Sequence, residues 1–185
     1  MPHRQPNKKR RLPKVWLMTD PRLGDALLAL IRKLPFGSGV VFRHYQLETG
    51  ERLMLFQQIQ RICRQRGHIL VLAGSSDWGA DGVHGRSRIR LTQILTMPVH
   101  SVREIRNAQK LDADLLFLSP VFTTTSHLGA RALGMMQFSR LAKLAGPKNV
   151  IALGGMTRNK AQTITNRIAY GWAGIDAFMR SKIRT

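Results

Sequence analysis

The sequence predicts an α/β protein, a compact (β/α)8 TIM barrel. Eight short apolar runs recur along the 185 residues, and helix-like intervals separate most of them. The runs are too short and too uniformly apolar for half-exposed antiparallel strands, so they are typical of parallel strands covered by helices. An open doubly wound sheet is the alternative, and it too would place a binding site at the carboxyl ends of its strands.

The predicted strands are rich in β-branched and aliphatic residues, as buried strands are. In order they are VWLM (15–18), GVVFR (39–43), HILVLA (68–73), DGVH (81–84), ILTMPV (94–99), DLLFL (114–118), VIAL (150–153) and AGIDAF (173–178).

Five intervals have helical character: 24–34, 51–67, 101–112, 135–146 and 157–168. Ser101 followed by Glu104 has the form of a capping box, and Thr157 is a candidate N-cap. The intervals after the third and fourth strands, GSSDWGA and GRSRIRLTQ, are too short or too irregular for full helices. We therefore expect abbreviated helices there. In the second helix one apolar face is formed by Leu53, Phe56, Ile59 and Cys63.

The chain carries 30 Lys and Arg against 10 Asp and Glu, a formal charge of +20. This excess favours phosphorylated ligands, nucleic acid or acidic surfaces as partners. We expect residues 1–13 to form a basic, flexible tail, which offers a possible nucleic-acid contact, and residues 14–180 to form one barrel domain. No apolar run approaches the roughly 20 residues that span a bilayer. With one cysteine, Cys63, the chain is expected to be cytoplasmic.

Polar residues follow the predicted strands, and in a barrel they converge on one rim. Hydroxyl groups and the amides of a Gly-Gly turn suit phosphate oxygens. Arg43 directly follows a buried strand, where a guanidinium needs an anionic partner. His84 is a candidate for the same rim, although an interior histidine bonded to the protein is the alternative. The full set is Thr19, Asp20, Arg43, His44, Asp77, His84, His100, the hydroxyl-rich run 123–127, Gly154, Gly155 and Asp176.

Several chemistries lack their sequence signals. There is no His/Cys pattern with zinc spacing, no GxxxxGK[ST] loop and no nucleophile beside a base. Asp81 and Asp114 begin strands, which is the wrong end for a site at the rim. The residues by themselves predict no metal site and no acid/base pair.

Six segments in this order resemble the superfamily of thiamine phosphate synthase and thiazole tautomerase. The resemblance covers about residues 15–178. It is carried by WLMTDPRL, GVVFRHY, GADGVHG, VHSVREIRNAQKLDADLLFLSPVFTTTSHLGARALG, VIALGGM and GWAGIDAF. It implies a (β/α)8 barrel that joins an aminopyrimidine diphosphate to a thiazole phosphate, with magnesium holding the pyrophosphate that leaves.

The resemblance also implies roles for individual residues. Arg43 matches the arginine of the family's QLRxK motif, and Thr124 and Ser126 match the hydroxyls of PTxTK. Gly154 and Gly155 match the turn that binds the thiazole phosphate. The predicted substrate-binding residues are thus Arg43, His84, Thr124, Ser126, Gly154 and Gly155, and His127 is the predicted proton donor.

The chain also departs from the family pattern. Val41 and Tyr45 replace the Gln and Lys of QLRxK, and His127 replaces the Lys of PTxTK. Magnesium is expected from the family, but its carboxylate ligands are absent: Ala73 and Gly74 replace Asn-Asp, and Arg86 and Arg88 stand where a second carboxylate is expected. An anion held directly by arginines is one consequence.

Two alternatives remain open at the level of sequence. One is a metal-independent thiazole tautomerase, although the histidine of that branch is Pro120 here. The other is a non-catalytic barrel that binds a phosphorylated ligand or RNA.

Overall fold

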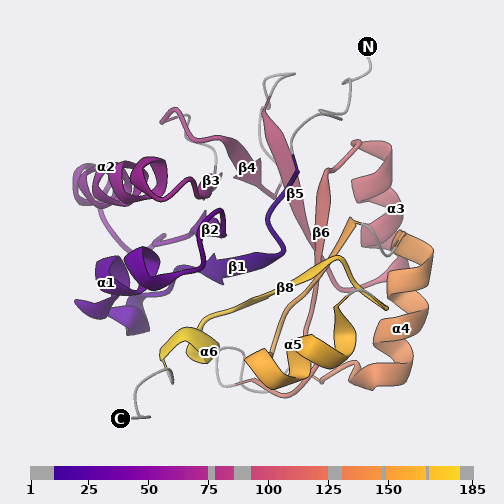
Figure 1. Ribbon diagram of the computed structural model, residues 1–185. Coiled ribbons are helices and arrows are strands. Elements are labelled where there is room, and N and C mark those ends of the chain that lie inside the picture. Colours follow the sequence, from indigo (N-terminus) through magenta and orange to yellow (C-terminus); the bar gives the residue numbers. More distant parts are fainter. Residues whose placement is uncertain are drawn as a thin grey trace.

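Eight parallel strands close into a barrel in which each strand pairs with the next and β8 pairs with β1 (Figure 1). This computed structural model describes residues 11–74, 78–85, 93–124, 131–146, 149–165 and 167–179. The strands are β1 (Val15–Met18), β2 (Gly39–Phe42), β3 (Ile69–Ala73), β4 (Gly82–His84), β5 (Ile94–Val99), β6 (Leu115–Leu118), β7 (Val150–Ala152) and β8 (Gly171–Gly174). The predicted (β/α)8 barrel is confirmed.

Helices cover the outside of the barrel (Figure 1). Between β3 and β5, the described residues 78–85 contain no helix, and most of the two intervals expected to hold abbreviated helices lie outside the described residues. The helices are η1 (Pro21–Leu23), α1 (Ala26–Lys33), α2 (Thr49–Gln65), α3 (Val102–Lys110), α4 (Gly134–Ala145), α5 (Arg158–Ile164) and α6 (Asp176–Met179).

The eighth strand differs from its prediction. It was expected over 173–178, but β8 begins at Gly171, which pairs with Ile151 of β7, and α6 begins at Asp176. An apolar run shows no period that separates a strand from a short helix, so only pairing with β7 and β1 defines the boundary.

Local capping follows the sequence. The Ser101 hydroxyl accepts a hydrogen bond from the amide of Glu104, and the Thr157 hydroxyl accepts one from the amide of Lys160. On α2, Phe56, Ile59 and Cys63 are buried. Burial raises the pKa of the Cys63 thiol to about 12, so this side chain behaves as a packing group.

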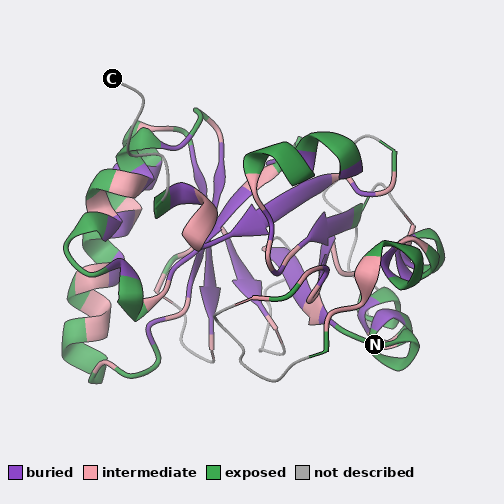
Figure 2. Cartoon of the chain, turned by 90° about the horizontal axis from the view of Figure 1, so that it is seen from below, coloured by how far each residue is buried: buried purple, intermediate pink, exposed green. Residues whose placement is uncertain are grey.

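The strands form the buried centre of the molecule, and the outer faces of the helices are exposed (Figure 2). Trp16 fills the barrel interior beside Gly39, where any Cβ would lie 2.1 Å from the indole ring. The Trp16 and Phe117 rings meet edge to face with centroids 5.4 Å apart. Side chains thus pack the barrel interior at this level, as they do in other TIM barrels. In the part of the chain described, no helix is both long and apolar enough to cross a bilayer.

Candidate active site

A cavity of about 130 Å³ opens at the carboxyl ends of the strands. Four of the predicted binding residues line it together: Arg43, Thr124, Gly154 and Gly155. Ser126 and the predicted proton donor His127 lie outside the described residues, as do Asp77, Arg86 and Arg88. The rest of the lining is Met18, His100, Ser119, Pro120, Leu153, Met156, Gly174, Ile175 and Asp176.

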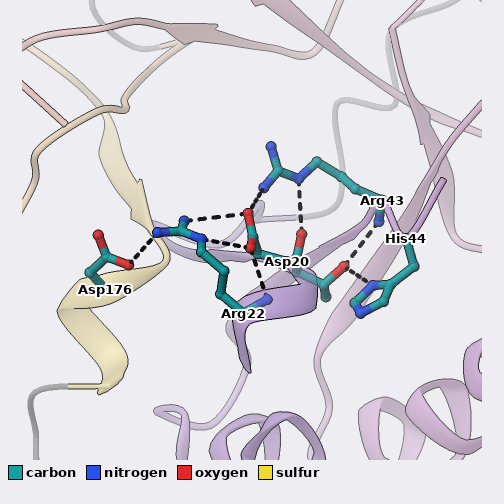
Figure 3. Close-up of polar contacts among 6 residues, drawn as sticks. Asp20, Arg22, Arg43, His44 and Asp176 are labelled. Carbon is teal, nitrogen blue, oxygen red and sulfur yellow. Dashed lines mark hydrogen bonds and ion pairs between the residues drawn. The ribbon is translucent and has the colours of Figure 1, made fainter. Parts of the chain in front are cut away.

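Arg43 follows β2 and is held in place by the residues that follow β1. Its Nε donates to the carbonyl oxygen of Thr19 at 2.9 Å, and its Nη2 lies 3.2 Å from Oδ2 of Asp20 (Figure 3). Burial lowers the pKa of Arg43, and the Asp20 charge opposes that shift. The guanidinium therefore lines the cavity already oriented, and among the described residues its Nη1 has no hydrogen-bond partner.

Asp20 connects this arginine to a second one. Its Oδ1 accepts from Nε of Arg22 at 2.8 Å, and Nη1 of Arg22 lies 3.4 Å from Oδ1 of Asp176 (Figure 3). Burial would raise the pKa of Asp20, but hydrogen bonds from Arg22 and the charges of Arg22 and Arg43 hold it below its usual value. These ion pairs link Asp20, at the end of β1, through Arg22 to Asp176 at the start of α6.

His44 is linked to Arg43 through the Thr19 hydroxyl. Its Nδ1 lies 3.0 Å from the Thr19 hydroxyl, which also accepts a hydrogen bond from the Arg43 amide at 3.0 Å. The imidazole stacks on Phe42 with ring centroids 5.3 Å apart. Burial lowers the pKa of His44, so the ring is neutral near pH 7. We assign it a role in packing and orientation.

The Gly154–Gly155 turn lies against the segment that follows β6. Both glycines have positive φ, +93° and +59°, and the Gly154 carbonyl accepts from the Phe122 amide at 3.1 Å. A Cβ on Gly155 would lie 2.4 Å from the Thr123 carbonyl oxygen. Only glycine fits this close approach of two backbones.

Sequence reasoning missed Lys160, in the first turn of α5. Its Nζ donates to the Gly155 carbonyl at 3.0 Å and lies 4.2 Å from the centroid of the Phe122 ring. The only sequence signal was a lysine five residues after the Gly-Gly turn. It adds a cation to a turn that offers backbone amides.

The structure places His84 in the barrel interior, apart from the residues that line the cavity. Its Nδ1 lies 2.9 Å from the Thr96 hydroxyl, and its ring meets Phe117 edge to face at 5.1 Å. Burial, helped by the charge of Arg43, lowers the pKa of His84 to about 3. His84 therefore has the environment of an interior histidine that is bonded to the protein, which was the alternative to a binding residue at the rim.

His84 makes the stability of the fold depend on pH. In the unfolded chain the imidazole takes up a proton near pH 6.5, but in the folded chain it does so only near pH 3, so stability is lost as pH falls through this interval. Relative to a His84→Gln variant, the wild type should lose about 2 to 3 kcal/mol of unfolding free energy between about pH 7.5 and about pH 4.5. Urea denaturation of both proteins at the two pH values measures this, and a constant difference would contradict it.

Comparison with known proteins identifies the family. A family model described as thiamine monophosphate synthase matches residues 17–178. The chain belongs to this family. Its members act in thiamine biosynthesis, and the match does not favour an RNA-binding barrel or a separate tautomerase.

Individual proteins that are similar to this chain carry names of the same family. The thiamine-phosphate synthase of Syntrophomonas wolfei subsp. wolfei is 27% identical, with 89% of this chain and 88% of that protein covered. The thiamine-phosphate synthase of Bacillus velezensis is 23% identical over 84% of this chain and 78% of its own length. The solved thiamine phosphate pyrophosphorylase of Pyrococcus furiosus superposes with a TM-score of 0.76 at 23% identity, covering 91% of this chain and 88% of its own, and supports the fold.

Magnesium, which the family generally uses, does not fit the described residues at the ends of β3 and β4. Gly74 stands where the family pattern has an aspartate, and the Nη2 of Arg52 lies 3.6 Å from the point where a Gly74 Cβ would be. The same Nη2 donates to the Ala73 carbonyl at 2.7 Å. Within the described ranges no three His, Cys, Asp or Glu side chains group as metal ligands. A guanidinium thus occupies the neighbourhood where a carboxylate is expected.

Proposed function

We propose that this protein is a thiamine phosphate synthase, which joins an aminopyrimidine diphosphate to a thiazole phosphate. The C–O bond between the pyrimidine methylene and the diphosphate breaks, the electron pair leaves with pyrophosphate, and the thiazole nitrogen forms the new C–N bond. One observation carries the proposal above all: Arg43, Thr124 and the Gly154–Gly155 turn line the same cavity in a chain of this family.

The two anionic groups have different partners in this proposal. The amides of the Gly-Gly turn bind the thiazole phosphate, and Lys160 lies beside them. Arg43 faces the diphosphate, because its half-buried guanidinium is oriented by Asp20 and Thr19. Apolar side chains, Met18, Leu153 and Ile175, line the space between them and suit flat heterocycles.

We propose that residues in the segment after β6 bind the substrate and donate a proton. We keep Ser126 as a binding hydroxyl because it matches a hydroxyl of PTxTK, and His127 as the proton donor because it replaces the lysine that ends this motif. His84 is left out of the chemistry because its ring is bonded to Thr96 and stays neutral. Replacing His127 with asparagine tests the assignment through the pH profile of kcat.

The decisive experiment is product formation. Purified protein is incubated with aminopyrimidine diphosphate and thiazole phosphate, and thiamine phosphate and pyrophosphate are followed by mass spectrometry. We expect both products in equal amounts, and we expect the gene to restore growth of a thiamine-requiring strain that lacks its own synthase. Absence of both products and of growth would refute the proposal.

A further inference from the structure

Arg52, in the first turn of α2, is the most unusual cation at the rim. Its guanidinium carbon lies 5.0 Å from the ring centroid of Trp78 and 5.5 Å from those of Phe42 and Tyr45. Aromatic faces stabilise a guanidinium by cation–π attraction and by stacking, and they also shield it from water. The side chain is therefore fixed in place between β2 and β3.

The charge of Arg52 has no acidic counterpart in the described part of the chain. Its Nη2 donates to the carbonyl oxygens of Ala73 at 2.7 Å and Arg43 at 3.4 Å, which are neutral groups. Its Nε is buried with no partner among the residues described. A shielded cation that lacks a carboxylate partner is expected to attract an anionic ligand.

Arg52 also lies beside the proposed diphosphate site. The carbonyl that it contacts belongs to Arg43, whose side chain lines the cavity. Tyr45 replaces the lysine of QLRxK, and the charges of Arg43 and Arg52 oppose the rise that burial causes in its pKa. At the end of β3, Gly74 carries no side chain that would cover the guanidinium.

We propose that Arg52 and Arg43 together bind the diphosphate directly, without a divalent cation. This rests on the proposed function, because it names how the leaving group of that reaction is held. Guanidinium groups offer several N–H donors in one plane, so they suit phosphoryl oxygens, and they stabilise the negative charge that develops as the C–O bond breaks.

The test is calorimetry with inorganic pyrophosphate on the full-length protein, in excess EDTA and again with excess Mg²⁺. We expect the Kd without metal to lie within about threefold of the Kd with metal, and Arg52→Gln to weaken binding about 10-fold to 100-fold, the range for a charge-assisted hydrogen bond. Arg61→Gln, the same change on an exposed turn of the same helix, should bind like wild type. It controls for the net charge of +20.

Two results would overturn the inference. One is pyrophosphate binding that requires Mg²⁺ in the wild type, a measurement that needs no variant. The other is an Arg52→Gln protein with wild-type melting temperature and unchanged Kd, which would leave Arg52 a purely structural clamp on the Ala73 and Arg43 carbonyls. Thiazole phosphate is titrated separately into the wild-type protein. If the protein binds pyrophosphate without metal but does not bind thiazole phosphate, the result counts against the proposed function and not against the role of Arg52.

Discussion

Replacing Arg43 with alanine is expected to lower kcat/KM for thiamine phosphate formation at least about 100-fold, equivalent to about 2.7 kcal/mol. The guanidinium is half-buried and oriented by Thr19 and Asp20, so its N–H groups meet the diphosphate with little loss of side-chain freedom. Its removal also leaves the negative charge of Asp20 at the site, although Arg22 still neutralises part of it. Steady-state kinetics of product formation give the value.

Two variants control this prediction. Arg32→Ala removes an exposed arginine of α1 and should leave kcat/KM within about twofold, because exposed charges contribute little. Arg43→Lys keeps the charge but loses the planar donors, so we expect an intermediate loss. An Arg43→Ala protein that turns over within threefold of wild type would remove this arginine from the site.

Replacing Gly155 with alanine is expected to cost about 2 to 5 kcal/mol of unfolding free energy and to abolish thiazole phosphate binding. Two physical effects add. The φ of +59° is unfavourable for an alanine by about 1 to 2 kcal/mol. The new Cβ would also lie 2.4 Å from the Thr123 carbonyl and 2.7 Å from Cβ of Phe122, and such overpacking costs about 1 to 3 kcal/mol.

Gly37→Ala separates the two effects. Gly37 has a similar φ of +71°, but a Cβ there would meet nothing within 4 Å. Urea denaturation should therefore show a loss of only about 1 to 2 kcal/mol for this variant. Calorimetry with thiazole phosphate should find unchanged binding, because Gly37 is not part of the cavity lining. Equal losses in the two variants would show that the two segments are not tightly packed at Gly155.

Much of the fold could be predicted because its signals are local. Each strand is an apolar run bounded by polar or glycine residues, and Ser101 and Thr157 mark helix starts by the bonds that they make within one turn. Arg43 and the Gly-Gly turn could be placed at the rim because the carboxyl ends of parallel strands meet there. The resemblance to the family added the ligands that we propose.

Other features depend on contacts between distant segments. His84 is the last residue of β4, and this position in the sequence predicts a place at the rim. Its side chain lies in the interior, because Thr96 of β5 and Phe117 of β6 contact it. In the sequence, Arg52 looks like an ordinary exposed charge on a helix. In the folded chain, α2 places it over the ends of β2 and β3. The residues that surround His84 and Arg52 follow no regular spacing along the sequence, so a sequence pattern could not predict these contacts.

Apolar runs, capping residues and the Gly-Gly turn predict the number and order of the strands, the helix starts at Ser101 and Thr157, and the residues that follow the strand ends. These features depend on burial period, capping and turn chemistry within a few residues. Contacts between distant segments set which charges face the cavity and where β8 ends. They also place a guanidinium beside Gly74, where the family has a carboxylate. Electrostatic energy and packing depend on separation in space, and barrel closure alone sets those separations.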